Sequence, residues 1–461
     1  MVASTAAARR FTPVQALLCT AALAAVIAVW TGWPVQTQGL AHVAVATVFA
    51  VAIAWRVTLI ALSRPPAPAA RLSNRALPTY TIIAPLRDEA AMVEPLMRAL
   101  RRIDYPARKL QIILAIDADD DATLAAAQRL PRRAGLSVLA VPVAQPRTKP
   151  RVCNAALAHA TGELVVIFDA EDEPDPTQLR EAAARFAQGG EQLACLQSPL
   201  RISPAKGFLA RQFALEYAAQ FEVGLPALAR LGLPFPLGGT SNHLRTSILR
   251  EVGAWDAWNV TEDADLGFRL AQHGYRTGVL ATPTHEAPPE ALRDWLPQRT
   301  RWIKGYVQTW GVHMRTPLSG GWRRLIALQL TTGLSITGSV VHGPMAIAVL
   351  ARVLADGMAV QVPRLEPADV AVLVMGWAAA CWSLAVGTRR AGLKMHASDA
   401  LAVLLYWPLQ SLCVAWALWQ FALRPHHWDK TPHHPRAASL PPGNGASGTG
   451  RAGSRAGKSA G

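Results

Sequence analysis

The sequence predicts an α/β domain with a parallel sheet, flanked by membrane-spanning helices. Two features support this prediction. Between residues 78 and 317, short apolar runs alternate with segments of helical pattern, as in parallel sheets whose two faces are covered by helices. On both sides of this block, long stretches contain no Asp, Glu, Lys or Arg, as expected of helices that cross a bilayer.

The composition favours a membrane protein over a nucleic-acid-binding one. Only 17% of the 461 residues are charged, whereas a soluble protein carries about 25%. The net charge is +15, but no basic stretch interleaved with aromatic residues forms a recognisable nucleic-acid-binding module. Much of the positive charge lies beside the apolar segments and in the C-terminal tail. We therefore expect membrane lipid as a partner and no nucleic acid.

Two transmembrane helices are expected within residues 1–63. Residues 11–55 carry no charged side chain, which is enough for two spans of about 20 residues each. The break between them is expected at residues 33–39. The arginines at positions 9, 10 and 56 place both outer ends in the cytoplasm. A cleaved signal peptide is the alternative, which the missing charge break before the second run disfavours.

A linker rich in Pro, Ala and Arg is expected at residues 64–77, before a soluble domain at residues 78–317. The expected strands are short continuous apolar runs, and polar segments of helical pattern separate them. In such sheets, ligands bind beyond the carboxyl ends of the strands. Strands are expected at 79–84, 110–116, 138–143 and 163–168, and helices at 88–102, from about 122, and at 152–160.

The C-terminal region, residues 318–423, returns to the membrane in three charge-free segments, 325–351, 370–388 and 400–423. Three full spans would place the tail of residues 424–461 outside. That tail is basic and has Asp429 as its one acidic residue, so the positive-inside rule places it in the cytoplasm. One segment is therefore expected to be re-entrant or to lie flat on the interface, and 400–423, broken by Pro408, is the candidate. The last twenty or so residues are predicted to be disordered.

Acidic residues follow the second predicted strand. The carboxylates of Asp117, Asp119 and Asp120 can accept hydrogen bonds from a uracil ring or a ribose hydroxyl. The alternative is a solvated turn that caps the helix beginning at Asp121. Taken alone, this cluster favours the alternative.

A second acidic cluster, Asp169, Glu171 and Asp172, follows the strand at 163–168. Two carboxylates two residues apart can hold one Mg²⁺ or Mn²⁺ and leave coordination sites for phosphate oxygens. A purely structural role explains the cluster poorly, because polar residues placed after a buried strand need partners. We therefore predict a metal site here.

Two further segments could contact a bound ligand. Lys149 and Arg151 open a predicted helix, where they could meet a diphosphate, and a pair of surface cations is an equally good interpretation. Gly239 and Thr240 lie in a small-residue loop that permits close approach of a ligand to the backbone. An ordinary turn is the alternative for this loop.

The last two motifs are Thr261-Glu262-Asp263 and Gln298-Arg299-Thr300-Arg301-Trp302. Asp263 could remove a proton from an acceptor hydroxyl, while capping of a helix by Thr261 is the alternative. Arg301 can pair with a diphosphate, and Trp302 offers a flat face to a sugar ring. An interfacial belt of Arg and Trp side chains is the alternative for this motif, and we assign Trp295 and Trp310 to such a belt.

Together these motifs resemble the D, DxD, TED and Q(Q/R)xRW set of the processive family-2 glycosyltransferases, to which cellulose synthase and hyaluronan synthase belong. The resemblance runs from about residue 78 to the end of the last apolar segment. Two departures stand out. The second motif reads Asp-Ala-Glu, so its second metal ligand is Glu171 or Asp172, and the first motif offers Asp117, Asp119 or Asp120.

The resemblance implies a Rossmann-like GT-A domain on the cytoplasmic face of a multi-pass protein of the bacterial inner membrane. It also implies an inverting, hexosyltransferase-type reaction that moves sugar from a nucleotide sugar, a UDP-sugar, to a growing polysaccharide or another glycan or lipid-linked acceptor. Asp263 is then the catalytic base, and Asp169 with Glu171 or Asp172 holds Mg²⁺ or Mn²⁺. The nucleotide-sugar contacts are Asp117, Asp119, Asp120, Lys149, Asp169 and Arg301, and the acceptor contacts are Gly239, Thr240, Glu262, Gln298 and Trp302.

Two other functions remain compatible with the sequence. One is transfer of a single sugar to a polyprenyl phosphate, and the other is a non-catalytic membrane scaffold or phage-adsorption component. Residues 428–433 resemble a cytoplasmic end motif of a bacterial subgroup of the same family, which supports an inside tail. The tail is far too short for the cyclic-di-GMP-binding PilZ domain of bacterial cellulose synthases. Regulatory or export partners would therefore be separate proteins.

Overall fold

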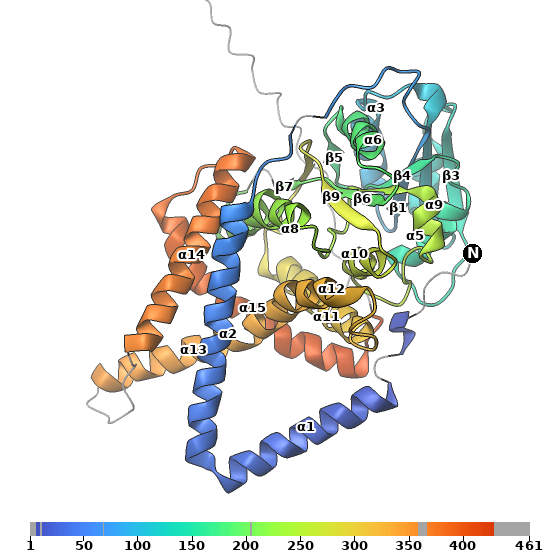
Figure 1. Ribbon diagram of the computed structural model, residues 1–461. Helices are drawn as coiled ribbons and strands as arrows, with labels where there is room; N and C mark the ends of the chain where they lie inside the picture. The colour runs from blue at the N-terminus through green and yellow to red at the C-terminus, as the bar shows by residue number, and fades with distance from the viewer. Residues whose placement is uncertain (1–5, 10–11, 68, 203–204, 358–366, 428–461) are drawn as a thin grey trace, which may run out of the picture.

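The computed structural model of the chain combines an α/β domain with a group of long helices packed beside it (Figure 1). The domain carries the sheets and the shorter helices, whereas the long helices come from both ends of the sequence. The structure describes all residues except 1–5, 10–11, 68, 203–204, 358–366 and 428–461. Arg10, most of the basic tail and the predicted end motif at 428–433 therefore lie outside the described residues.

A seven-stranded sheet forms the centre of the domain, in the order β3-β2-β1-β4-β8-β6-β9. Its first four strands are parallel, which confirms the predicted alternation of strand and helix. Strand β8 runs antiparallel to both of its neighbours, so the sheet is mixed rather than wholly parallel as predicted. The strands are β1 (Tyr80–Leu86), β2 (Leu110–Asp117), β3 (Leu136–Val141), β4 (Leu164–Ile167), β6 (Leu193–Gln197), β8 (Asn242–Arg245) and β9 (Arg276–Val279).

Apolar clusters cover both faces of this sheet. Successive strand residues point to opposite faces, so Ile82 packs in one cluster and Ile83 in the other. Burial on both faces explains why the predicted strands are continuous apolar runs instead of alternating ones. The helices of the domain are α3 (Val93–Arg101), α4 (Asp121–Gln128), α5 (Lys149–Ala158), α6 (Gln178–Gln188), α7 (Phe208–Ala219), α8 (Leu225–Arg230), α9 (Thr246–Glu251), α10 (Glu262–Gln272) and α11 (Leu292–His313).

Short elements adjust the ends of the longer ones. The helix predicted at 88–102 begins only at Val93, because a loop and the 3₁₀ turn η2 (Ala90–Met92) precede it. Further 3₁₀ turns are η1 (Ala6–Ala8) and η3 (Ala107–Lys109), and a π-helical turn, η4 (Gln220–Gly224), joins α7 to α8. A small second sheet, β5-β10-β7, combines β5 (Glu173–Pro174), β7 (Leu200–Ile202) and β10 (Thr284–Glu286).

Two helices, α1 (Pro13–Gly32) and α2 (Pro34–Leu62), meet at Trp33, where the sequence predicts the break. Pro34 opens α2, since a proline fits the first position of a helix. Figure 1 shows the pair as a V, with α1 turned away from the direction of α2. The apolar part of α1 is short, whereas residues 39–62 of α2 are long and apolar enough to cross a membrane.

The C-terminal helices are α12 (Gly321–Leu328), α13 (Leu334–Gly357), α14 (Pro367–Ala391) and α15 (Ala397–Leu423), and the π-helical turn η5 (Gln329–Gly333) joins α12 to α13. Counting residues 39–62, four helical segments in the described part of the chain are long and apolar enough to cross a membrane. α14 packs along α2, and α15 packs along α13 and α11. In Figure 1 the α13–α15 pair runs across the direction of α2 and α14.

The predicted break at Pro408 is wrong. α15 continues through this proline as a single helix. A proline removes one backbone hydrogen bond, but a helix held by neighbouring helices can tolerate that loss. α15 is held in this way by α11 and α13.

Candidate active site

A pocket of about 370 Å³ opens at the carboxyl ends of β1, β2 and β4, between the sheet and α11. Asp117 and Asp169 both lie at such strand ends, as predicted. We call the side of the pocket formed by Asp117, Lys149, Asp169 and Glu171 the strand-end wall. We call the opposite side the helix wall, formed by α11 residues Gln298, Arg301 and Trp302 with Ser335, Ser339 and Gln410 of α13 and α15.

Of the first acidic cluster, Asp117 reaches the pocket. It is 2% exposed and is held by an ion pair with Arg151 of α5. Asp120 is turned the other way: it caps α4 by accepting a hydrogen bond from the Thr123 amide at 3.1 Å. Asp119 is half-exposed and does not line the pocket, although its ion-pair partner Arg147 does. The turn after β2 thus fits both interpretations of the cluster: Asp117 is available to a ligand, whereas Asp120 caps a helix. Asp119 and Asp120 do not line the pocket.

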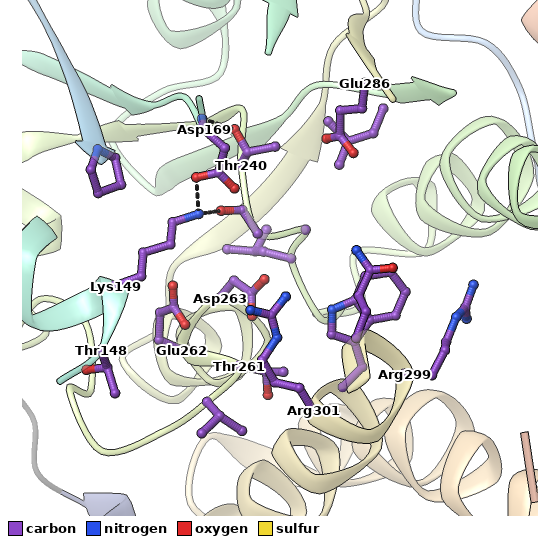
Figure 2. A pocket seen from close by; sticks show the side chains of 18 of the residues that line it. Thr148, Lys149, Asp169, Thr240, Thr261, Glu262, Asp263, Glu286, Arg299 and Arg301 are labelled. Atoms are coloured by element: carbon purple, nitrogen blue, oxygen red, sulfur yellow. Dashed lines mark hydrogen bonds and ion pairs between the residues drawn. The ribbon is translucent and has the colours of Figure 1, made fainter. Parts of the chain in front are cut away.

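Lys149 links the strand-end wall to the loop that carries Gly239 and Thr240, which we call the glycine loop (Figure 2). Its ammonium group pairs with Asp169 and donates a hydrogen bond to the Gly239 carbonyl at 2.6 Å. Burial opposes the positive charge, but the carboxylates of Asp169 and Glu262 outweigh it and hold the pKa of Lys149 above its usual range. Lys149 is therefore a permanent cation inside the pocket, next to the predicted metal ligand.

The predicted metal ligands divide into two kinds. Asp169 and Glu171 line the pocket, whereas Asp172 is buried behind it. Asp172 accepts a hydrogen bond from the Asp169 amide at 2.7 Å and another from the Thr240 hydroxyl. Burial, together with the carboxylates of Glu286, Asp169 and Glu171, raises the pKa of Asp172 well above its usual value. These contacts make Asp172 a support for the loop that carries Asp169.

The remaining pair fits a divalent cation that shares its coordination with a ligand. No group of three His, Cys, Asp or Glu side chains among the described residues is arranged to hold a metal by itself. Asp169 and Glu171 offer hard oxygen donors on one loop, which suits Mg²⁺ or Mn²⁺ when phosphate oxygens and water complete the shell. The site can thus accept a metal ion brought with, or completed by, a diphosphate.

Asp263 lies across the pocket from Asp169, in the first turn of α10 (Figure 2). The Ala264 amide donates a hydrogen bond to its Oδ1 at 2.7 Å. A Cβ on Gly239 would stand 3.3 Å from its Oδ2, so the glycine loop passes close by. Burial raises the pKa of Asp263 to about 6, against the opposing effects of the Ala264 hydrogen bond, Lys149 and Arg301. Burial and the neighbouring Asp263 likewise raise the pKa of Glu262, which also lines the pocket.

A tight contact sets the position of α11 relative to this carboxylate. Thr261 occupies the N-cap position of α10 but does not make the side-chain cap that was the alternative role for this motif. Its side chain packs instead against Gly305 of α11, where an added Cβ would lie 2.3 Å from the Thr261 hydroxyl oxygen. Such a contact is possible only for glycine, and it brings α11 against the loop that carries Asp263.

The two arginines of the α11 motif point in different directions. In Figure 2, Arg301 reaches toward Asp263, whereas Arg299 turns away from it. Trp302 lines the pocket, and its ring packs near those of Phe213 and Tyr217 at centroid distances of 5.9 and 6.1 Å. Trp295 does not belong to an interfacial belt as predicted: it is fully buried and donates a hydrogen bond to the Tyr406 hydroxyl.

Several pocket residues were not predicted from the sequence: Glu216, Tyr217, Glu286, Tyr306, Ser335, Ser339 and Gln410. Glu216 lies in mid-helix, and no local pattern distinguishes it. A usable signal existed for the last three, since polar residues inside apolar membrane helices commonly face a functional interior. Ser339 and Gln410 do so here and are hydrogen-bonded to each other at 3.3 Å.

Comparison with known proteins defines the class. Residues 164–422 match the family model described as glycosyl transferase family group 2, and residues 81–235 match that of glycosyl transferase family 2. Because the first match spans more than half of the chain, the chain belongs to the family-2 group of glycosyltransferases. This confirms the predicted membership of the family-2 glycosyltransferases and the predicted fold class, whereas the processive type stays a prediction.

The relatives are distant. A probable glycosyltransferase YdaM of Bacillus subtilis is 24% identical over 51% of this chain and 57% of its own length. A beta-monoglucosyldiacylglycerol synthase of Synechocystis is 26% identical over 54% of this chain and 53% of its own. A cellulose synthase catalytic subunit of Xanthomonas axonopodis is 27% identical over 61% of this chain and 37% of its own length. The chain spans about half the length of the first curated relatives it matches, and less of cellulose synthase.

A solved structure supports the fold. The mannosyltransferase PcManGT of Pyrobaculum calidifontis superposes with a TM-score of 0.58 at 20% identity, over 84% of this chain and 99% of the other. At this identity the likeness concerns the fold: an α/β glycosyltransferase domain of the GT-A type together with further helices.

Proposed function

We propose that this protein is an inverting, hexosyltransferase-type enzyme of the bacterial inner membrane that transfers sugar from a UDP-sugar to a glycan or lipid-linked acceptor, with a growing polysaccharide as the main candidate. One observation carries the proposal. Asp169 and Asp263 come from distant parts of the chain yet line the same pocket, with Lys149 beside Asp169 and Arg301 beside Asp263 (Figure 2).

The strand-end wall suits the donor. Asp117 could accept hydrogen bonds from the nucleoside, and Lys149 could neutralise a diphosphate together with Arg301 of the helix wall. Asp169 and Glu171 would hold Mg²⁺ or Mn²⁺, which would stabilise the charge on the departing diphosphate. Two relatives are consistent with this: the mannosyltransferase was solved with GDP-Man and Mn²⁺, and the cellulose synthase subunit is described as UDP-forming.

Asp263 suits the role of base. An inverting transfer needs a carboxylate that takes the acceptor proton as the acceptor oxygen attacks the anomeric carbon from the side opposite the diphosphate. Asp263 faces the strand-end wall across the pocket. Its pKa of about 6 leaves it mostly unprotonated at neutral pH and still basic enough to accept a proton.

The helix wall suits the acceptor. Trp302 offers an aromatic face to a sugar ring, and Gln298, Glu262, Gly239 and Thr240 add polar groups around it. Ser335, Ser339 and Gln410 extend the lining into helices that are apolar enough to cross a membrane. An acceptor that approaches along these helices, either a glycan chain or a lipid-linked sugar, accounts for polar groups in such segments.

The proposal includes a placement in the membrane. Residues 1–63 would form the N-terminal membrane helices, 64–77 a linker, 78–317 the catalytic domain and 318–423 the C-terminal membrane or interfacial helices. The basic charge of residues 424–461 favours a cytoplasmic tail, on the same side as the proposed catalytic domain. Three of the four candidate spans among the described residues follow that domain, so the proposal requires that one of these three is re-entrant or lies flat on the interface.

A second candidate is transfer of one sugar to a membrane lipid, a polyprenyl phosphate among others. The relative from Synechocystis supports it, because its name describes a product with a single glucose on diacylglycerol. In that case the polar residues of α13 and α15 would admit a lipid head group instead of a polymer.

The direct test uses membranes that contain the full-length protein. They are incubated with Mn²⁺ and a panel of UDP-sugars, with GDP-mannose as a further donor, and release of the nucleoside diphosphate is measured. We expect one or a few donors to be turned over, and membranes with Asp263→Asn provide the matched control. Chromatography of the labelled product separates a polymer from a singly glycosylated lipid. Absence of turnover with every donor would contradict the proposal and favour the non-catalytic scaffold.

A further inference from the structure

Arg299 of α11 lines the pocket and is held by charged and hydroxyl groups from two other helices. Its Nη1 donates a hydrogen bond to Glu216 Oε1 of α7 at 2.7 Å, and its Nη2 donates to Glu216 Oε2 and to the Tyr406 hydroxyl of α15 at 3.0 Å. The Tyr406 hydroxyl in turn donates to Glu216 Oε2 at 2.9 Å. Arg299 and Tyr406 are buried, at 6% and 2% exposed, whereas the Glu216 side chain is 31% exposed and lines the pocket.

Aromatic rings complete the enclosure. The guanidinium carbon of Arg299 lies 4.7 Å from the ring centroid of Trp302, 5.0 Å from that of Phe213 and 5.5 Å from that of Trp295. These distances are in the range of favourable cation–π contacts. We call Glu216, Arg299, Tyr406, Phe213 and Trp295 the arginine cage. Its closest ring contact, Trp302, is one of the aromatic residues that line the pocket.

The cage connects three elements that are far apart in the sequence. α7 and α11 belong to the catalytic domain, whereas α15 is one of the helices apolar enough to cross a membrane. The Tyr406 hydroxyl accepts from Arg299 and from Trp295 Nε1 (3.2 Å) and donates to Glu216, so its hydrogen-bonding capacity is fully used. A buried charged group is strongly destabilised when it loses a partner. A shift of α15 that moved Tyr406 would therefore disturb the position of Arg299.

We propose that Arg299 is a positioning residue for the acceptor subsite: Glu216 and Tyr406 fix its guanidinium, and the guanidinium fixes the ring of Trp302. The position of a membrane helix would in this way control how well the acceptor is held. This inference rests on the proposed function and goes beyond it, because it assigns to Arg299, Glu216 and Tyr406 a role in choosing between acceptor and water.

The chemical choice is between two nucleophiles. In transfer, the acceptor oxygen forms a bond to the anomeric carbon, the bond from that carbon to the diphosphate oxygen breaks, and Asp263 takes the acceptor proton. In hydrolysis, a water oxygen takes the place of the acceptor oxygen, and the same bond to the diphosphate breaks. The products are free sugar, the nucleoside diphosphate and a proton. A misplaced Trp302 weakens binding of the acceptor but not of water, and therefore favours hydrolysis.

The test is the partition of one labelled donor between the two products. Full-length protein in its membranes is given the radiolabelled UDP-sugar that the wild type turns over fastest, and label in glycosylated product is compared with label in free sugar. We expect Tyr406→Phe to lower the ratio of transfer to hydrolysis about tenfold, the size associated with losing a hydrogen bond to a charged group. Arg299→Lys keeps the charge but cannot bridge both partners, and we expect it to lower the ratio as well.

Tyr275→Phe is the matched control, because it removes another tyrosine hydroxyl that is bonded to a carboxylate, that of Glu251, at an exposed site away from the pocket. Its ratio should equal that of the wild type. The ratio does not depend on how much protein folds, so a variant that only lowers stability reduces both products in proportion. Unchanged ratios in Tyr406→Phe and Arg299→Lys would overturn the inference. If Tyr406→Phe yields no folded protein, Arg299→Lys decides alone. A wild type that turns over no donor would instead contradict the proposed function.

Discussion

The strand-end wall and the helix wall of the pocket are built on different principles. Asp117 and Asp169 of the strand-end wall follow buried strands, and neighbouring cations of α5 hold both carboxylates. The helix wall depends on Trp302, which packs against an arginine enclosed by three helices, one of them apolar enough to cross a membrane. The first wall therefore follows from sheet geometry, whereas the second also depends on the packing of the long apolar helix α15.

The difference suggests a division of labour. In the proposed function, the charged groups anchored at the sheet suit the diphosphate of the donor, which is the same in every turnover. In the proposed function, an aromatic surface packed on helices that are apolar enough to cross a membrane suits an acceptor that must arrive and move on. Asp263 lies between the two walls, so substitutions there and on either side can separate binding of the donor from transfer.

The largest effect is expected at the carboxylate between the walls. Asp263→Asn keeps the shape but removes the base, so we expect the rate of transfer to fall by about 10²- to 10⁴-fold. Binding of UDP with Mn²⁺, measured by titration calorimetry, should change little because the strand-end wall is intact. Loss of UDP binding in this variant would assign Asp263 to the donor side instead.

The next largest effect tests the strand-end wall alone. Asp169→Ala should weaken Mn²⁺-dependent binding of UDP about 10- to 100-fold, as loss of one strong charged contact would. Asp172→Asn is the informative comparison, since its carboxylate supports the loop from behind the pocket. Calorimetry with and without Mn²⁺ should give near wild-type affinity for that variant. A loss as large as that of Asp169→Ala would make Asp172 a metal ligand after all.

An effect of about tenfold is expected from pH. A base acts only when it is unprotonated. Because burial raises the pKa of Asp263 to about 6, its carboxylate becomes protonated, and inactive as a base, at a higher pH than an ordinary aspartate. Between pH 7 and pH 5 the unprotonated fraction falls about tenfold, and kcat/KM for transfer should fall with it. A profile that stays flat between pH 7 and pH 5, with intact protein at both ends, would contradict the assignment.

The smallest effect distinguishes residues within the first acidic cluster. Asp117→Asn should weaken UDP binding measurably, because Asp117 is buried and lines the pocket. Asp119→Asn should change affinity less than about twofold, since an exposed ion pair such as that with Arg147 contributes little. Equal losses in the two variants would mean that the bound state recruits Asp119 from outside the pocket.

Much of the strand-end wall could be predicted because its signals are local. Continuous apolar runs define β1, β2 and β4, and the carboxyl ends of adjacent parallel strands must lie at one edge of the sheet. That reasoning alone places Asp117 and Asp169 at the same edge. It could not separate Asp119 and Asp120 from Asp117, because that depends on where α4 begins and which carboxylate caps it.

By itself, the sequence determined the α/β sheet, the apolar helices on either side of it and the order of the acidic motifs, since periodicity and charge-free length are properties of consecutive residues. Only the tertiary structure decided that Asp172 supports the loop of Asp169 from behind, and that Arg299 and Arg301 of one motif face different surroundings. It alone also brought Ser339, Tyr406 and Gln410 to the pocket region from helices in the C-terminal half. The physical reason is that these placements depend on the packing of α7, α11, α13 and α15 against one another, and such long-range contacts leave no local pattern in the chain.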